Sequence, residues 1–268
     1  ILCNREIKFN VFLNEAKKMG ADMIATGHYA KIAKYKDHFV LDTPKDNTKD
    51  QSYFLHALSS EQLSHAMFPL GDLTKKEVRE IAREHNLPVS DKKDSTGICF
   101  IGNQKFDEFI TQHLKAIPGD ILDENGKVIG KHKGLVCYTL GQRKGIGLGG
   151  IKGNESENNT HKPWFVALKD VVNNTLTIVQ DTNHPLLMSK NVEASHMHWV
   201  LEEAPKVGDK LMAQVRYRQQ KQACTVVASA EKVVVEFDNP QRAVTLGQSL
   251  VLYSGDYCLG GGFISYYK

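Results

Sequence analysis

The hydrophobic pattern of this 268-residue chain changes near Pro118. Before that point, apolar residues recur at helical spacing over residues 4–19, and a short apolar strand follows at residues 23–26. After it, short alternating segments and turn residues recur to the end of the chain, which is typical of β structure. The pattern predicts an α/β domain over residues 1–109, a small β-rich central domain over 110–180 and a C-terminal β-barrel over 181–268.

The composition narrows the class of protein. With 34 Lys and Arg against 31 Asp and Glu, the formal net charge of +3 is too small to indicate nucleic-acid binding without a local basic surface. The chain has no apolar run as long as a membrane span needs, and its five cysteines are expected to be the reduced thiols of a cytoplasmic protein. Cysteines and histidines do not occur at zinc-ligand spacing, so we predict no metal ligated by protein side chains alone.

Local signals place the expected elements along the chain. Asn4 is expected to cap the first helix, and Gly20 to end it. The other expected elements are a hairpin at residues 30–43, a helix at 49–58, a helix from the Thr74 capping box to Asn86, a helix at 106–114, an exposed loop at 154–160, and strands at 211–218, 223–228, 232–237, 249–253 and 263–267.

Two cysteines have surroundings that favour a reactive thiolate. Cys3 directly precedes the first expected helix and lies near Arg5, so the helix dipole and a positive charge favour ionisation. Cys99 follows two lysines in a polar loop. The structural alternatives remain open: Cys3 as a half-buried residue before a helix, and Cys99 as a small core residue. The remaining cysteines fall in expected strand interiors: Cys137, Cys224 and Cys258.

Two glycine-containing segments are candidates for ligand contact. Gly27 and His28 follow a short strand, and the carboxyl ends of strands in α/β sheets commonly carry ligands. Gly145-x-Gly147-x-x-Gly150 matches the dinucleotide fingerprint formally, but no strand-to-helix junction surrounds it. We interpret it as a tightly turned or flexible loop, in which residues 142–144 are candidates for phosphate contact.

Arg216-Tyr217-Arg218 combines cations with an aromatic ring on an expected strand. The alternation would place both arginines on one face and Tyr217 on the other. Arginine binds phosphate through two parallel hydrogen bonds, and tyrosine can stack on a base, so the segment suits RNA. A solvated strand face with a core tyrosine is the alternative.

Seven phrases, in this order, resemble the bacterial tRNA-specific 2-thiouridylases. They run along the whole chain, and it is their number and order that carry the resemblance. The phrases are Leu2-Cys-Asn-Arg-Glu-Ile-Lys-Phe9, Ala25-Thr-Gly-His-Tyr29, Lys49-Asp-Gln-Ser-Tyr-Phe54, Phe68-Pro-Leu-Gly-Asp72, Lys93-Asp-Ser-Thr-Gly-Ile-Cys-Phe-Ile-Gly102, Gly141-Gln-Arg-Lys-Gly145 and Cys258-Leu-Gly-Gly-Gly262.

The resemblance implies a Rossmann-like fold of the adenine-nucleotide-hydrolase type for the first domain, and a sulfur-transfer reaction. ATP, with Mg²⁺ bound through the nucleotide, adenylates the C2 oxygen of the wobble uridine of tRNA, and a cysteine persulfide delivers sulfur to C2. Cys99 matches the persulfide carrier. Cys3 matches the nucleophile, which releases sulfide or forms a transient disulfide. The implied partners are a tRNA with a wobble uridine and a cysteine desulfurase or sulfur-relay protein, with no membrane.

The resemblance also assigns binding positions. Gly27 matches a position that contacts ATP. Seven residues match positions that touch tRNA: His28, Lys49, Asp50, Gln51, Arg216, Tyr217 and Gln248.

The chain departs from the family pattern before Cys3. The Ser-Gly-Gly-x-Asp-Ser nucleotide loop and the Asn-Pro-Asp of the target-base pocket have no counterpart in these residues. We therefore expect a fragment that alone neither holds ATP tightly nor adenylates tRNA efficiently. Two alternatives remain: a non-catalytic RNA-binding remnant, and a thiol-disulfide oxidoreductase, which the absence of Cys-x-x-Cys disfavours.

Overall fold

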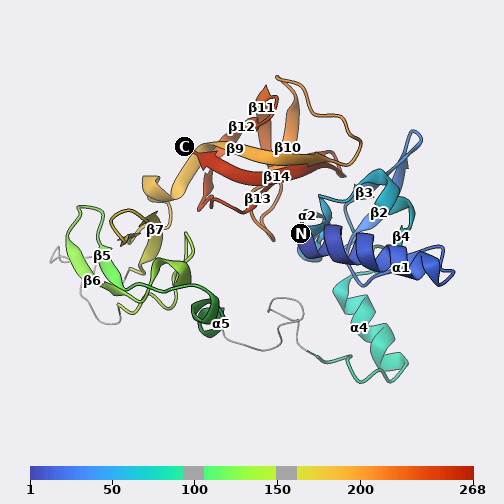
Figure 1. Ribbon diagram of the computed structural model, residues 1–268, viewed down its shortest axis with the longest axis horizontal. Helices are drawn as coiled ribbons and strands as arrows, with labels where there is room; N and C mark the ends of the chain where they lie inside the picture. Colours follow the sequence, from blue (N-terminus) through green and yellow to red (C-terminus); the bar gives the residue numbers. More distant parts are fainter. Residues whose placement is uncertain (93–105, 149–161) are drawn as a thin grey trace. The chain divides into compact units, whose positions relative to one another are not determined.

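The computed structural model describes residues 1–92, 106–148 and 162–268 (Figure 1). It divides into two compact units. The first is formed by Ile1–Lys93, Lys190–Pro240 and Leu246–Lys268, and the second by Asp94–Ser189 and Gln241–Thr245. The first unit has one hydrophobic core to which both ends of the chain contribute, with Phe9 and Leu58 from the beginning and Val251 and Tyr253 from the end. Residues far apart in sequence are thereby fixed beside one another.

The first unit begins with a continuous helical segment, the π-type helix η1 (Cys3–Phe12) followed by α1 (Leu13–Lys18). It ends at Gly20, which adopts the left-handed conformation with φ 90°. The expected N-cap is wrong: Asn4 lies inside the first turn, because the Ile1 carbonyl accepts hydrogen bonds from the backbone amides of Asn4 and Arg5 at 2.9 and 3.1 Å. The Asn4 side chain is buried and donates to the Phe54 carbonyl at 3.1 Å.

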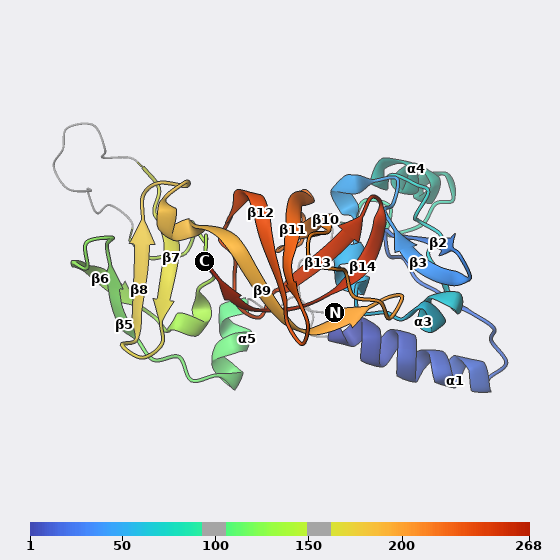
Figure 2. The same cartoon turned by 90° about the horizontal axis from the view of Figure 1, so that it is seen from above.

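A short parallel pair and a hairpin follow. Strand β1 (Ile24–Ala25) pairs with β4 (Ala66–Met67), and β2 (Lys31–Tyr35) with β3 (His38–Asp42) forms the expected hairpin. The hairpin continues into the large sheet, because β3 pairs with β14 (Tyr257–Tyr267), as Figure 2 shows. This pairing ties the beginning of the chain to its last strand.

The helices between these strands are short. The expected helix at 49–58 is divided into η2 (Asn47–Lys49) and α2 (Ser52–Leu55), and Ser59 then caps α3 (Ser60–Ser64). Helix α4 (Lys75–Glu84) has the expected capping box, in which Thr74 and Glu77 exchange side-chain and backbone hydrogen bonds. Asn86, the expected stop, is left-handed with φ 53° just beyond the helix. The Thr74 box and Asn86 therefore predicted both ends of α4 to within two residues.

Six strands within residues 188–267 close the expected barrel. They are β9 (Met188–Trp199), β10 (Lys210–Gln214), β11 (Gln222–Ser229), β12 (Val233–Arg242), β13 (Ser249–Ser254) and β14. Strand β13 pairs with both β10 and β14, which closes the ring. Gly260 has φ 142° and lies against the His198 carbonyl, where a Cβ has no room. The glycines of the last strand thus permit the close backbone approach expected for them.

Two expectations about strands are wrong. Strand β10 ends at Gln214, so Arg216 and Tyr217 lie in the turn before β11, where Arg218 has φ 64°. Cys137 lies in the 3₁₀-helix η3 (Leu135–Cys137), while Cys224 and Cys258 lie in strands as expected. In the turn, packing of Tyr217 on Phe54 (ring centroids 4.3 Å apart) replaces the strand that the alternating pattern predicts.

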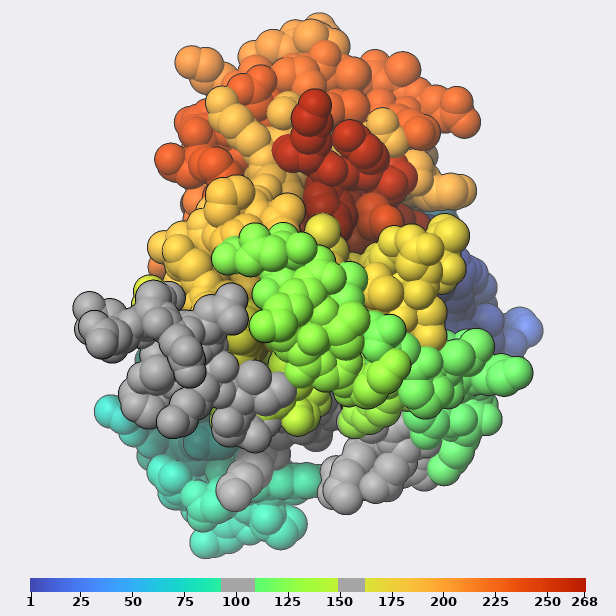
Figure 3. All heavy atoms as spheres, turned by 90° about the vertical axis from the view of Figure 1, so that its left-hand side faces the viewer, coloured from blue at the N-terminus to red at the C-terminus, as the bar shows by residue number. Residues whose placement is uncertain are grey.

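The second unit is a small β structure. Its strands are β5 (Gly119–Leu122), β6 (Val128–His132), β7 (Phe165–Asp170) and β8 (Thr175–Val179), in the order β6-β5-β8-β7. Helix α5 (Phe106–His113) precedes them, close to its expected bounds, and η4 (Pro185–Leu187) follows. Figure 3 shows the surface of this unit in green and yellow. Gly145 and Gly147 have φ 78° and 85° in the tightly turned loop expected there, and Gly150 and the expected loop at 154–160 lie outside the described residues.

Across the three described ranges, no helix has the length and apolar character that crossing a membrane requires.

Candidate functional site

Cys3 lies at the start of η1, half-buried and with a free thiol. Its neighbour Asn4 is tied to the carbonyl of Phe54 in α2, so the turn that carries Cys3 has a fixed place against that helix. Cys99, the other candidate thiol, lies outside the described residues. Of the two predicted sulfur-handling residues, the structure therefore places Cys3 alone.

Gly27 and His28 follow β1, where the backbone amide of Thr26 still bonds to the Met67 carbonyl at 3.0 Å. Gly27 is exposed, and a Cβ at this position would meet only the Leu70 side chain, at 3.8 Å. A ligand can therefore approach the backbone here. The position at the end of a strand agrees with the sequence-based expectation.

The His28 imidazole is held between aromatic rings. Its centroid lies 6.2 Å from that of Phe9 and 6.0 Å from that of Phe68, and its Nδ1 shares a 2.8 Å hydrogen bond with the Thr26 hydroxyl. Burial, and then the positive charge of Lys8, lower the pKa of His28 from 6.5 to about 4. The ring is therefore neutral at pH 7, suited to hydrogen bonding or stacking rather than to an ion pair with phosphate.

Residues 49–51 are tied to the loop that carries His28. The Gln51 amide donates to the Tyr29 carbonyl at 2.9 Å, and the Gln51 side-chain oxygen accepts from the Tyr29 amide at 2.9 Å. The preceding turn, η2, is capped by Asp46, whose carboxylate accepts from the Thr48 amide at 3.1 Å. Residue 28 and residues 49–51, two predicted tRNA-contacting segments, are thus held together by two hydrogen bonds between Tyr29 and Gln51.

The β10–β11 turn brings Arg216 and Tyr217 close to helix α2. The Tyr217 ring packs on Phe54, and the Arg218 guanidinium lies 5.5 Å from the Tyr217 centroid on the exposed side. Burial raises the pKa of Tyr53 to about 12, an effect that the nearby charge of Arg216 partly opposes. Tyr217 is therefore a half-buried ring supported by α2, with a cation beside it.

Gln248 is exposed and immediately precedes β13. The next residue, Ser249, accepts a hydrogen bond from the Tyr53 hydroxyl through its carbonyl at 3.0 Å. Its hydroxyl lies 3.2 Å from His56 Nε2. The loop that carries Gln248 is thereby fixed to α2, the short helix on which Tyr217 packs.

Three family models match the chain in succession. Residues 1–103 match the model described as "tRNA methyl transferase HUP domain", residues 107–180 the "tRNA methyl transferase PRC-barrel domain", and residues 189–264 the "Aminomethyltransferase beta-barrel domain". Together they span both described units.

Curated relatives match nearly the full length of the chain. It is 96% identical over 269 residues to "tRNA-specific 2-thiouridylase MnmA 2" of Aliarcobacter butzleri, covering 100% of this chain and 73% of that protein. The chain belongs to the tRNA-specific 2-thiouridylase family. It is 51% identical to the MnmA proteins of Herminiimonas arsenicoxydans (99% of this chain, 72% of the relative) and Francisella philomiragia (98% and 73%).

In this 2-thiouridylase, the predicted site residues of the first unit converge on α2. Asn4 beside Cys3 bonds to Phe54, Tyr217 packs on Phe54, and Ser249 beside Gln248 bonds to Tyr53. Residues 49–51 lead directly into the helix and hold the loop that carries His28. The structure thus fixes the segments that carry Cys3, His28, residues 49–51, Tyr217 and Gln248 against or beside one short helix.

Sequence reasoning missed the residues that make this convergence possible. Tyr53 and Phe54 belong to the segment Lys49-Asp-Gln-Ser-Tyr-Phe54, but the resemblance assigned tRNA contact only to residues 49–51. Lys221 and Tyr253 received none, because no local pattern marks either residue as part of a network between distant segments. Among the described residues, no three His, Cys, Asp or Glu side chains are grouped to hold a metal ion.

Proposed function

We propose that this protein is a tRNA-uridine 2-sulfurtransferase that replaces the C2 oxygen of the wobble uridine of tRNA with sulfur. The observation that carries the proposal is the full-length match to proteins named tRNA-specific 2-thiouridylases. The convergence of residues 28, 49–51, 216–217 and 248 around α2 supports it, because a tRNA surface needs them on one unit. We further propose that residues 1–109, 110–180 and 181–268 are its functional domains.

ATP is the proposed activating co-substrate, with Mg²⁺ carried by the nucleotide. When bound, ATP supplies the adenylyl group that makes the uridine C2 oxygen a good leaving group. The exposed backbone of Gly27, with no side chain closer than that of Leu70, is the proposed contact for the nucleotide. The neutral His28 beside it would present a hydrogen-bonding ring rather than a second positive charge.

Two cysteines divide the sulfur chemistry in this proposal. Cys99 carries the persulfide, and its terminal sulfur forms the new bond to C2 while the adenylated oxygen departs. Cys3 attacks the inner sulfur of Cys99, which breaks the S–S bond of the persulfide and forms a Cys3–Cys99 disulfide. An external thiol then reduces the disulfide for the next cycle. The half-buried, free thiol of Cys3 at the start of η1 supports this role.

The proposed partners are a tRNA and a persulfide donor of the cysteine desulfurase or sulfur-relay class. His28, Lys49, Asp50, Gln51, Arg216, Tyr217 and Gln248 form the proposed tRNA surface. Reduced thiols suit the proposed cytoplasmic location. The free state of Cys3, Cys137, Cys224 and Cys258 is in keeping with it.

Persulfide loading tests the proposal without ATP or tRNA. The protein is incubated with a cysteine desulfurase and cysteine, and the cysteine peptides are analysed by mass spectrometry for an added sulfur. Loading is expected on Cys99 and is lost in Cys99→Ser, whereas the control Cys224→Ser, a buried thiol whose pKa is raised to about 12, keeps it. Tight tRNA binding with no sulfur on any cysteine would favour the non-catalytic RNA-binding alternative instead.

A further inference from the structure

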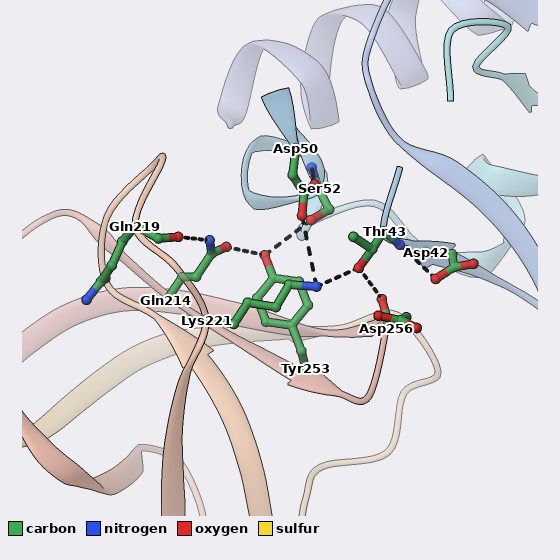
Figure 4. Close-up of polar contacts among 9 residues, drawn as sticks. All are labelled: Asp42, Thr43, Asp50, Ser52, Gln214, Gln219, Lys221, Tyr253 and Asp256. Atoms are coloured by element: carbon green, nitrogen blue, oxygen red, sulfur yellow. Dashed lines mark hydrogen bonds and ion pairs between the residues drawn. The ribbon is translucent and has the colours of Figure 1, made fainter. Parts of the chain in front are cut away.

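A partly buried cation, the Lys221 ammonium, joins the tRNA segment at residues 49–51 to the barrel. The Lys221 side chain is 17% exposed and that of Asp50 is 9% exposed, and their charged atoms lie 3.9 Å apart. The Lys221 ammonium also donates to the Thr43 hydroxyl at 2.6 Å and lies 4.0 Å from the Tyr253 ring centroid. Figure 4 shows Lys221 and Tyr253 of the barrel facing Thr43 and Asp50 of the beginning of the chain. A buried ammonium is costly unless such partners compensate it, so this arrangement is specific.

The Asp50 carboxylate is directed into this network. One oxygen accepts from the Ser52 amide at 2.8 Å, and the other faces Lys221. Both oxygens therefore have partners within the protein. The conformation of residues 49–51 depends on the cation that the barrel supplies.

Tyr253 continues the network toward the other tRNA segment. Its ring is buried, and its hydroxyl lies 3.2 Å from the Ser52 hydroxyl and donates to the Gln214 side chain at 2.7 Å. Gln214 in turn donates to the Gln219 carbonyl, and the Gln219 side chain accepts from the Val215 amide at 3.0 Å. These bonds close the β10–β11 turn that carries Arg216 and Tyr217. Burial raises the pKa of Tyr253 well above its usual value, so the phenol remains a donor.

We propose that Lys221 and Tyr253 are positioning residues, which hold residues 49–51 and the Arg216–Tyr217 turn in the single arrangement that tRNA binding requires. The inference rests on the proposed function, since it concerns the same tRNA surface. Neither side chain touches tRNA in this role. Lys221 acts through Asp50, and Tyr253 acts through Ser52 and Gln214. A buried polar network of this kind fixes geometry, whereas apolar packing alone would leave the two segments free to shift.

Lys221→Met tests the role of the charge, since it keeps the length and apolar stem of the side chain. We expect tRNA affinity to fall about tenfold at a temperature well below the melting transition. Lys221→Arg should recover part of the loss. The matched control is Lys232→Met, which removes a barrel lysine that pairs with Glu193 at 2.7 Å on the exposed surface and should leave affinity unchanged.

A double-mutant cycle separates positioning from direct contact. If Lys221 acts by placing residues 49–51, then Lys221→Met should add little to the loss already caused by Lys49→Ala. Independent contacts would instead multiply the two losses. Multiplied losses, or wild-type affinity in Lys221→Met, would overturn the proposal.

Hydrogen exchange gives a readout that does not need tRNA. In Lys221→Met, backbone amides in residues 43–54 should exchange faster than in the wild-type protein, while amides of α4 keep their rates. Unchanged exchange in residues 43–54 would overturn the positioning role. Failure of the wild-type protein to bind any tRNA would overturn the proposed function, and the exchange rates would still show whether Lys221 holds the segment.

Discussion

The Tyr53 hydroxyl and the backbone of Ser249 exchange two hydrogen bonds, one donated to the carbonyl at 3.0 Å and one accepted from the amide at 3.2 Å, across 196 positions of sequence. Both residues are buried, so water does not replace these bonds. The pair fixes the loop of Gln248 against α2. It is one of the contacts that make the beginning of the chain and the barrel a single unit.

Removal of this hydroxyl should destabilise the protein. In Tyr53→Phe, the ring packing is kept, but both backbone groups of Ser249 lose a partner. We expect the free energy of unfolding to fall by about 1–3 kcal/mol, measured by urea denaturation. Tyr266→Phe is the control, because Tyr266 is 54% exposed and should change stability little. Equal stability of the two variants would contradict the assigned hydrogen bonds.

His28 should make the stability of the protein depend on pH below neutrality. Its pKa is lowered from 6.5 to about 4, so between these values the unfolded chain binds a proton that the folded protein does not. The contribution of His28 to the free energy of unfolding is therefore fully present above pH 6.5 and is lost as the pH falls toward 4. Below pH 4 the group causes no further loss. The loss in the free energy of unfolding that His28 causes between these pH values is about 1–3 kcal/mol.

His28→Gln should reduce the slope of unfolding free energy against pH between 6.5 and 4, measured by urea denaturation at several pH values. Some slope should remain, because burial also lowers the pKa of His56, to about 3. The exposed His38, substituted by Gln, is the control and should leave the slope as it is in the wild-type protein. A variant at His28 with the full wild-type slope would show that its ring is not buried as described.

Local sequence chemistry predicted those parts of the fold that local interactions determine. The Thr74 capping box gave the start of α4, and Gly20 gave the end of α1. The closed barrel followed from repeated short strands and turns. At both helix ends the deciding residues lie within a few positions of the feature that they fix, and each barrel strand is marked by its own alternation and turns.

The errors arose where distant residues decide the local structure. Alternation extended a strand through Arg216 and Tyr217, but the packing of Tyr217 on Phe54 makes that segment a turn. Asn4 has the chemistry of a helix cap, yet its side chain is used by the carbonyl of Phe54. For the candidate site, the resemblance supplied individual residues, while the Lys221 network that joins their segments is a tertiary feature with no local pattern.

Arg216→Ala should weaken tRNA binding and flatten its salt dependence. If Arg216 neutralises a phosphate, the plot of log affinity against log salt should lose about one unit of slope, since one fewer counterion is released. The measurement is fluorescence anisotropy with labelled tRNA at several salt concentrations. Arg83→Ala is the charge-matched control, because Arg83 on α4 pairs with Asp91 at 3.0 Å. A slope unchanged from wild type would place Arg216 outside the tRNA interface.

The cysteines should differ sharply in reactivity. Burial raises the pKa of the Cys224 and Cys258 thiols to about 12, so at pH 7.5 both are protonated as well as inaccessible. Cys3 is half-buried and free at the start of η1, so a reagent can reach its thiol. Brief treatment with iodoacetamide, followed by peptide mass spectrometry, should therefore label Cys3 and spare the other two.

The same labelling in urea provides the control, because all three thiols should react once the protein unfolds. After persulfide loading, Cys3→Ser should also fail to form the Cys3–Cys99 disulfide, whereas Cys224→Ala should form it, since the Cys224 thiol has no part in the proposed chemistry. Rapid labelling of Cys258 in the native protein would contradict its burial within β14. Unchanged release of sulfide from the Cys99 persulfide in Cys3→Ser would show that another group resolves the persulfide, and would remove Cys3 from the proposed catalytic pair.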